Sequence, residues 1–274
     1  MRSAAASVLL LLVANAAAGQ PPEPNTYSFR ASLGYASQAL GDVNDDITQD
    51  AAFYGPLSTS LDWEEFGKAA PFGLEFGYQY SERWSWAFGF NWHKSTIEHV
   101  AQLDYIATGE SGFDVHYTGE STEDRDLKLL DLYATAMFWI PHASGLHFGA
   151  QLGYALGSLD FSETIDVSGE DGSFLDLEGN GEGHASGFSA GIYAGYEVAL
   201  TQKWAISARG GYLYCNLGKM DGREQLLGTS SAGPINGTGT GHLNNNDGEA
   251  MDWDFSGARV SGAVTYRFRW SGSF

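Results

Sequence analysis

Three features are scarce in this sequence of 274 residues, and each shortage excludes a class of protein. There is one cysteine, Cys215, so no intramolecular disulfide framework is possible. Beyond the N-terminal segment there is no run of about 18 apolar residues, so the chain cannot cross a membrane as a helix there. Basic residues number 14 against 34 acidic ones, and the formal charge of −20 argues against nucleic acid as a partner.

The N-terminus has the three parts of a secretory signal peptide. Arg2 supplies the positive charge, Val8 to Val13 form the apolar stretch, and the small residues Ala14 to Gly19 form a cleavage zone. The spacing of small residues favours cleavage after Ala18. Residues 1–18 are therefore predicted to be removed on export, and the polar segment 19–26 is predicted to begin the mature chain as a tail.

Seven segments alternate between apolar and polar or small residues, which is the period of a β-strand, and an eighth, 130–140, is apolar on nearly both registers. The last segment of the chain is typical: Val264, Tyr266 and Phe268 alternate with Thr265 and Arg267. Such strands bury only alternate residues, so they are able to span a membrane as a β-barrel. The predicted strands cover 27–35, 72–80, 84–93, 130–140, 146–156, 188–200, 204–215 and 263–270.

The connections between these segments alternate between short and long. Three tight turns lie at 81–83, 141–145 and 201–203, and four long connections cover 39–70, 94–126, 158–184 and 219–254. This layout predicts an all-β fold, an eight-stranded up-and-down transmembrane barrel with four long extracellular loops. The alternation continues past the expected membrane segment at Leu159 to Val167 with the apolar parity reversed, which we interpret as a hairpin extension with a bulge near Gly157.

The size of the side chains decides which face of the strands points outward. An eight-stranded barrel has an interior only just wide enough for side chains. Trp84, Trp86, Phe88, Phe90 and Trp92 cannot all fit inside, whereas the Ser, Ala and Gly residues between them can. The aromatic register must therefore face lipid, which disfavours a soluble, lipocalin-like barrel with an apolar interior.

The closing segment Gly262-Ala263-Val264-Thr265-Tyr266-Arg267-Phe268 resembles the closing strand of the OmpA/OmpX-type outer-membrane β-barrel superfamily. The resemblance implies a barrel over 27–270 in the outer membrane of a Gram-negative envelope, with a tail at 271–274. It also implies insertion by the barrel-assembly machinery, which would read a terminal signal formed by Gly262, Val264, Tyr266, Phe268 and Trp270. We expect this chain to depart from those members of the superfamily that carry a C-terminal peptidoglycan-binding domain.

The negative charge is concentrated in the predicted loops, which hold 29 of the 34 acidic residues and five of the 14 basic ones. We interpret this as a solvated surface among lipopolysaccharide, cross-bridged by divalent cations; the alternative is an organised Ca²⁺ site or a surface for a basic partner. Asp42-Val43-Asn44-Asp45-Asp46 has the ligand spacing of an EF-hand, but Ile47 and Phe53 replace the required Gly and Glu. No metal site is predicted.

Charged residues in the inward register form a predicted lumen charge network. Burial would be costly without pairing, so these groups are expected either to close the barrel as a salt-bridged plug or to line a narrow, water-filled pore. The network is predicted to contain Arg30, Glu75, Asp131, Glu197, Arg209, Arg259, Arg267 and Arg269.

Catalytic chemistry has little support in the sequence. His184-Ala185-Ser186 is similar to the His-x-Ser of lipid A deacylases, but His93-Lys94-Ser95 and His142-Ala143-Ser144 match equally well, which indicates chance. No catalytic residue or cofactor is predicted. The sequence favours a monomeric, structural or surface-interaction barrel; the alternatives are a narrow pore for small solutes or cations and a lipid A-modifying enzyme.

Overall fold

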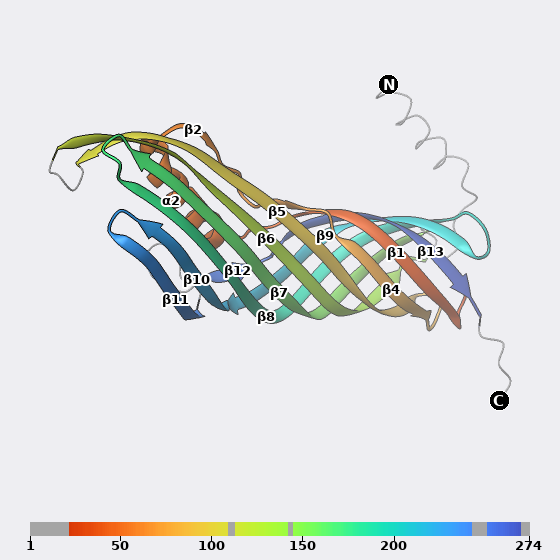
Figure 1. Cartoon of the computed structure of the whole chain (residues 1–274). Helices are drawn as coiled ribbons and strands as arrows, with labels where there is room; N and C mark the ends of the chain where they lie inside the picture. The colour runs from red at the N-terminus through yellow and green to blue at the C-terminus, as the bar shows by residue number, and fades with distance from the viewer. Residues whose placement is uncertain (1–21, 109–112, 142–144, 243–250, 270–274) are drawn as a thin grey trace, which may run out of the picture.

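The computed structural model describes residues 22–108, 113–141, 145–242 and 251–269 (Figure 1). The signal peptide, Trp270 and the tail 271–274 predicted above lie outside the described residues. Within the described ranges, no helix is long and apolar enough to cross a membrane. The elements in chain order are β1 (Thr26–Ser37), α2 (Gly41–Tyr54), the 3-10 turn η1 (Gly55–Leu57), β2 (Ser58–Asp62), β3 (Lys68–Ala69), β4 (Phe72–Gln79), β5 (Trp84–Thr108), β6 (Asp114–Trp139), β7 (Leu146–Gly169), β8 (Phe174–Ala199), β9 (Trp204–Lys219), β10 (Asp221–Ser230), β11 (Gly233–His242), β12 (Asp252–Asp254) and β13 (Gly257–Phe268).

Eight of these strands close into an antiparallel ring in the order β1, β4, β5, β6, β7, β8, β9 and β13. The ring closes where β13 pairs with β1, from Tyr27 opposite Phe268 to Ala36 opposite Arg259. Closure leaves no unpaired strand edge in the membrane, where backbone groups without partners are costly. The prediction of an eight-stranded up-and-down barrel is confirmed.

The outer surface of the ring is apolar and aromatic. Phe29, Phe88, Leu152, Ile192 and Val264 belong to the outward register, and each is about half to three-quarters exposed. The inward register carries small or polar residues, as the sequence predicts. An exposed band of this kind is stable only against lipid, so the ring is a transmembrane barrel.

Four strands continue far beyond the barrel. β5, β6, β7 and β8 are 25, 26, 24 and 26 residues long, whereas a membrane strand needs about 9–11 residues. The β10–β11 hairpin pairs with the edge of β8, and β2 pairs with β5 on the other side. We call β2, β10, β11 and the parts of β5–β8 within 94–126 and 158–184 the extracellular sheet (Figure 1). Two of the predicted loops are therefore mostly paired strand.

The expected bulge near Gly157 is absent from the described pairing. β7 pairs with β6 from His147 to Gly169 and with β8 from Leu146 to Ser168, in both cases without a shift. The apolar parity reverses because the surroundings change. Within the membrane the outer face meets lipid and the inner face lines a polar lumen, whereas outside it the outer face meets water. The inner residues Leu159, Phe161 and Val167 then pack in an apolar layer.

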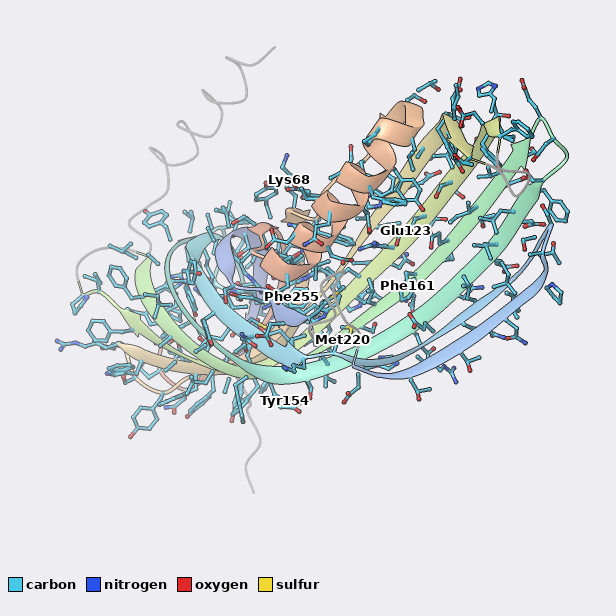
Figure 2. All side chains as sticks on the ribbon, turned by 90° about the vertical axis from the view of Figure 1, so that its left-hand side faces the viewer. Lys68, Glu123, Tyr154, Phe161, Met220 and Phe255 are labelled. Atoms are coloured by element: carbon cyan, nitrogen blue, oxygen red, sulfur yellow. The ribbon has the colours of Figure 1, made fainter. Side chains whose placement is uncertain are left out.

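Helix α2 lies across the concave face of the extracellular sheet (Figure 2). Its Val43 and Ile47 are buried, and Asn44 exchanges two hydrogen bonds with the backbone of Phe66. The acidic stretch that resembles an EF-hand is therefore helical. We call the cluster of buried residues between α2 and the barrel the mouth core; it contains Leu40, Val43, Ile47, Phe66, Ile97, Leu127, Leu129, Ala155, Leu159, Leu213, Cys215, Leu217, Met220, Met251, Trp253 and Phe255.

Candidate functional site

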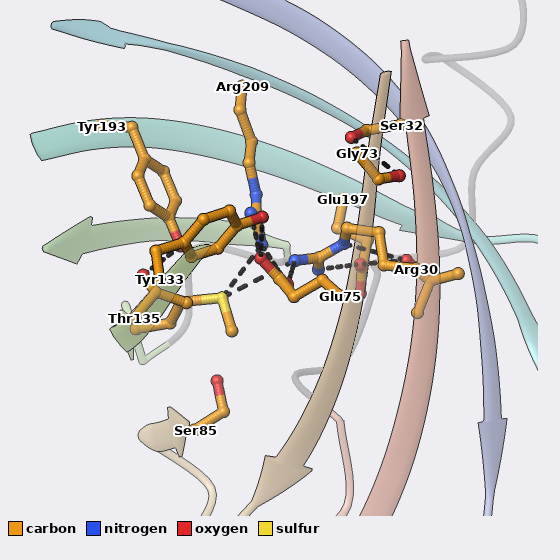
Figure 3. Close-up of polar contacts among 12 residues, drawn as sticks. Arg30, Ser32, Gly73, Glu75, Ser85, Tyr133, Thr135, Tyr193, Glu197 and Arg209 are labelled. Atoms are coloured by element: carbon orange, nitrogen blue, oxygen red, sulfur yellow. Dashed lines mark hydrogen bonds and ion pairs between the residues drawn. The ribbon is translucent and has the colours of Figure 1, made fainter. Parts of the chain in front are cut away.

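Arg30 lies at the centre of the lumen charge network (Figure 3). Its Nη1 is 2.5 Å from Oε1 of Glu75 on the neighbouring strand β4, and its Nη2 is 3.0 Å from Oε2 of Glu197 on β8. β8 is three strands away around the ring, so the second contact crosses the lumen. All three side chains are almost completely buried.

Two further arginines complete this centre. Arg209 on β9 donates to both carboxylate oxygens of Glu75 at 3.0 and 3.2 Å, again across the lumen, and its guanidinium lies 4.6 Å from the ring centre of Tyr193. Arg267 on β13 donates to Glu197. Each glutamate therefore joins two arginines, which satisfies charges that would be costly to bury alone.

Asp131 and Arg259 lie apart from this centre, toward the extracellular side. Asp131 accepts hydrogen bonds from Ser189 at 2.6 Å and Gln151 at 2.9 Å. Arg259 is inward-facing, and its Nη2 is buried without a hydrogen-bond partner among the described residues. The inward charges therefore form two layers instead of one.

Arg269 is a correction to the predicted lumen charge network. It follows the end of β13, is exposed, and pairs with Glu23 of the N-terminal tail. The alternation of the sequence continues to Trp270, but the strand ends at Phe268, so the inward register no longer applies at 269. The outward register holds Gly262, Val264, Tyr266 and Phe268 of the predicted assembly signal; Trp270 lies outside the described residues.

The lumen around these layers leaves little empty space. One cavity of about 90 Å³ lies beside Glu75, Tyr133 and Arg209, and another of about 20 Å³ lies on the periplasmic side near Arg30 and Arg267. The smaller volume holds no more than a water molecule or so. On the extracellular side, the mouth core covers the barrel with buried apolar side chains such as Trp253 and Phe255.

A polar cluster beneath α2 escaped the sequence prediction. Arg125 on β6 donates to Glu123 at 2.5 Å and to Asp50 on α2 at 2.9 Å, and it lies 3.4 Å from Asp46. His99, stacked on Trp63, contacts Glu123 at 3.3 Å. The sequence signal for this cluster is the alternation that continues through 94–126 and places odd-numbered residues on the concave face. The alternation does not show that α2 packs against that face.

The ionisation of this cluster is set by competing effects. Burial opposes the charge on Glu123, but the hydrogen bond from His99 and the charge of Arg125 outweigh it and lower the pKa of Glu123. Glu163, which accepts a 3.1 Å hydrogen bond from Tyr54, is shifted the other way. Burial, with the negative charges of Glu123 and Asp50, raises the pKa of Glu163.

These opposite shifts predict how pH acts on α2. A lowered pKa stabilises the fold above the unfolded value of 4.5, and the effect is lost as pH falls through the folded pKa. Glu123→Gln should therefore weaken the packing of α2 at pH 7 by about 1.5–3 kcal/mol and remove this acid sensitivity. Hydrogen exchange of α2 amides, corrected for intrinsic rates, measures it. Glu163→Gln is the control: its ionised form is disfavoured, so the variant should lose no protection.

The His-x-Ser segments are scattered over the molecule. His184 is exposed on the outer face of β8, and Ser186 Oγ there accepts a 2.7 Å hydrogen bond from the Tyr154 hydroxyl. His93 is buried in the lumen, where its Nε2 lies 2.6 Å from Nε2 of Gln38. Ser95, two residues further along β5, lies at the start of the extracellular sheet. Residues 142–144 of the third segment lie outside the described residues. Among the described residues, Ser95 and Ser186 are hydrogen-bonded to Lys68 and Tyr154, and neither is hydrogen-bonded to the histidine of its segment.

No protein-family model and no curated protein sequence matches the chain. Among solved structures, it is similar to Ail, the attachment invasion locus protein of Yersinia pestis, with 13% identity over 89% of this chain and 99% of that one and a TM-score of 0.39. Neisserial surface protein A matches with 14% identity, coverage of 89% and 97%, and a TM-score of 0.35. The outer membrane protein OprG from Pseudomonas aeruginosa matches with 13% identity, coverage of 92% and 100%, and a TM-score of 0.33.

By its own strand ring and register, the chain is an eight-stranded up-and-down membrane barrel. It differs from a minimal barrel in two respects. Its lumen is crossed by ion pairs, and its strands extend into an ordered extracellular sheet.

Proposed function

We propose that the protein is a closed outer-membrane barrel that anchors the extracellular sheet and acts in surface interaction. In this proposal the barrel is monomeric, its neighbours are outer-membrane lipids and lipopolysaccharide, and divalent cations bridge its acidic surface to those lipids. The N-terminal signal would direct export and be removed.

One observation carries the proposal: the ion pairs of Arg30 and Arg209 join strands on opposite sides of the lumen. A pore lined by these residues would need its charges to face water along the wall. Here they face each other, and both glutamates are at least nine-tenths buried. The mouth core adds a second, apolar barrier on the extracellular side.

The extracellular sheet supports the interaction role. A barrel that served only to stabilise the membrane would need only short loops. Here β5–β8 are each more than twice as long as a strand that only spans the bilayer. Ordering so much backbone is costly in entropy, and the mouth core and α2 supply the packing that offsets it. A rigid surface of this size is suited to holding a partner.

Planar-bilayer recording separates the closed barrel from the narrow pore. The refolded protein should give no steady conductance in salt solution, while a general porin refolded in the same way serves as the conducting control. Steady conductance of the unmodified protein would overturn the closed-barrel proposal. Unaltered lipid A masses on deleting the gene are expected as well, and a changed mass would revive the enzyme alternative.

A further inference from the structure

A groove of about 830 Å³ lies on the concave face of the extracellular sheet. Helix α2 forms one wall, β6 and β7 form part of the floor, and β10 and β11 form the other side. Figure 2 looks onto this face from the extracellular end, with Glu123 and Phe161 beside α2. The volume is in the range of sites that enclose a ligand of many atoms.

The floor is shaped by residues that lie opposite one another across five strands. One cross-strand row holds Arg125, Phe161, Gly181, Glu224 and Gly239. The Phe161 ring lies over Gly181, where an added Cβ would be 2.1 Å from it, and the Glu224 carboxylate lies over Gly239, where the distance would be 2.6 Å. A larger residue at either position would force the side chain of the neighbouring strand to move.

The next row of the concave face, farther from the membrane, leaves the floor of the groove open. It holds Glu123, Glu163, Gly179, Leu226 and Gly237. A Cβ at Gly179 would make ordinary contacts with Glu163 at 3.6 Å and Leu226 at 3.7 Å, so a larger residue fits there without a clash and the glycine keeps the sheet surface low beside Glu163. The half of the floor over β8 and β11 is therefore low, and an extended backbone could approach it closely.

The charge in the groove is strongly unbalanced. Arg125 is already held by Glu123, Asp46 and Asp50, so its charge is neutralised more than once. Within the described part of the chain, Glu163 accepts a hydrogen bond from the Tyr54 hydroxyl, and Glu224 is exposed above the glycines of the floor. Arg223, next to Glu224, also lines the groove, but its guanidinium already pairs with Glu182 at 2.9 Å.

We propose that this groove docks a basic peptide segment of a partner protein, with lysine or arginine side chains at Glu163 and Glu224 and an apolar side chain on Phe161. The inference rests on the proposed surface-interaction role and names the chemistry of the partner. The peptide backbone lies on the glycine floor. Phe161 and Tyr54, with the two-thirds exposed ring of Phe53 at the end of α2, provide aromatic faces that attract cations.

Other occupants fit less well. An anionic ligand would face five carboxylates of the lining against two arginines, Arg125 and Arg223, that are both already paired. For a metal ion, the described residues contain no group of three or more His, Cys, Asp or Glu side chains in a suitable arrangement. A basic peptide contacts the carboxylates, the aromatic rings and the low floor together. The match between its positive side chains and these carboxylates gives the specificity.

The test measures binding of a fluorescent decapeptide that alternates lysine and tyrosine to the full-length barrel in zwitterionic micelles. We expect binding that weakens with salt, and no binding of the matching glutamate–tyrosine peptide. Glu163→Gln combined with Glu224→Gln should weaken binding about tenfold, as expected for loss of two close charge pairs. Gly179→Val keeps every charge but raises the floor, and should weaken binding by a similar factor.

Glu98→Gln is the matched control, since it removes the same charge from the opposite face of the sheet. It should leave the affinity unchanged. No peptide binding, equal loss in Glu98→Gln, or full binding to Gly179→Val would each overturn the groove as the docking site. Displacement by spermine at the peptide's own affinity would instead assign a small cation. Because bilayer conductance is measured separately, a closed barrel that binds no peptide would reject this inference and leave the anchor proposal standing.

Discussion

Replacing Glu197 by Gln is expected to destabilise the barrel strongly. Glu197 is almost completely buried and accepts from Arg30 at 3.0 Å, from Thr265 at 3.3 Å and from Arg267. Glutamine keeps the size of the side chain but removes the charge, so two buried guanidinium groups lose their shared counter-ion. Breaking a buried ion pair by removing one partner costs about 3–5 kcal/mol.

The same change should open the lumen to water. Arg30 would retain Glu75, but Arg267 has no other carboxylate among its described contacts and would have to be hydrated. We therefore expect earlier unfolding in denaturant, measured in micelles, and conductance events that the unmodified barrel lacks. Glu75→Gln should act similarly through Arg30 and Arg209. Glu98→Gln, on the water-exposed outer face, should change neither property; unchanged melting of both lumen variants would contradict the plug.

The membrane part of the fold was predictable because lipid imposes one simple rule on it. Every outward residue of a strand must be apolar, and the narrow lumen admits only small or paired polar residues, so alternation alone locates the strands and their faces. Phe88 and Ile192 are outside and Glu75 and Glu197 are inside, as the sequence indicates. The positions of the tight turns followed from the same pattern.

Which charges meet inside was harder to predict. The sequence gives the inward register of each strand, but the offset between strands on opposite sides of the barrel decides that Arg30 reaches Glu197 while Asp131 meets Ser189 and Gln151. Arg269 shows the other limit. Its alternation with Phe268 and Trp270 persists in sequence after the strand has ended, so pattern alone could not exclude it.

Outside the membrane, the rule that located the strands changes. Water surrounds the extracellular sheet, so apolar residues move to the concave face, where α2 and the mouth core cover them. The reversed parity at Leu159 is visible in the sequence, but the sequence alone does not reveal that a helix covers this face. Without the helix, a bulge is the simpler interpretation of the reversal. α2 is only 14 residues long, half its residues are polar or acidic, and tertiary packing on Ile47 and Val43 holds it.

Phe268→Asp is expected to abolish most assembly of the barrel in the membrane. Phe268 lies on the lipid-facing side of the seam where the first and last strands pair, opposite Tyr27. Its ring stacks on Tyr27 and on Phe29, with centroids 5.7 Å away in each case. Losing two aromatic contacts costs about 1–3 kcal/mol, and a carboxylate at the lipid interface adds up to about 1 kcal/mol.

Phe268→Asp weakens the β1–β13 pairing that closes the ring. It also changes one of the residues that the OmpA/OmpX resemblance assigns to recognition by the assembly machinery. A destabilisation of this size changes the amount of folded protein several-fold, and failed recognition would add to it. The measurement is the amount of heat-modifiable, folded barrel in outer-membrane fractions. Phe268→Leu, which keeps an apolar side chain, should retain most of it, and removal of Phe274 should have little effect. If removing Phe274 blocks assembly while Phe268→Asp does not, the signal lies at the extreme C-terminus and not on the closing strand.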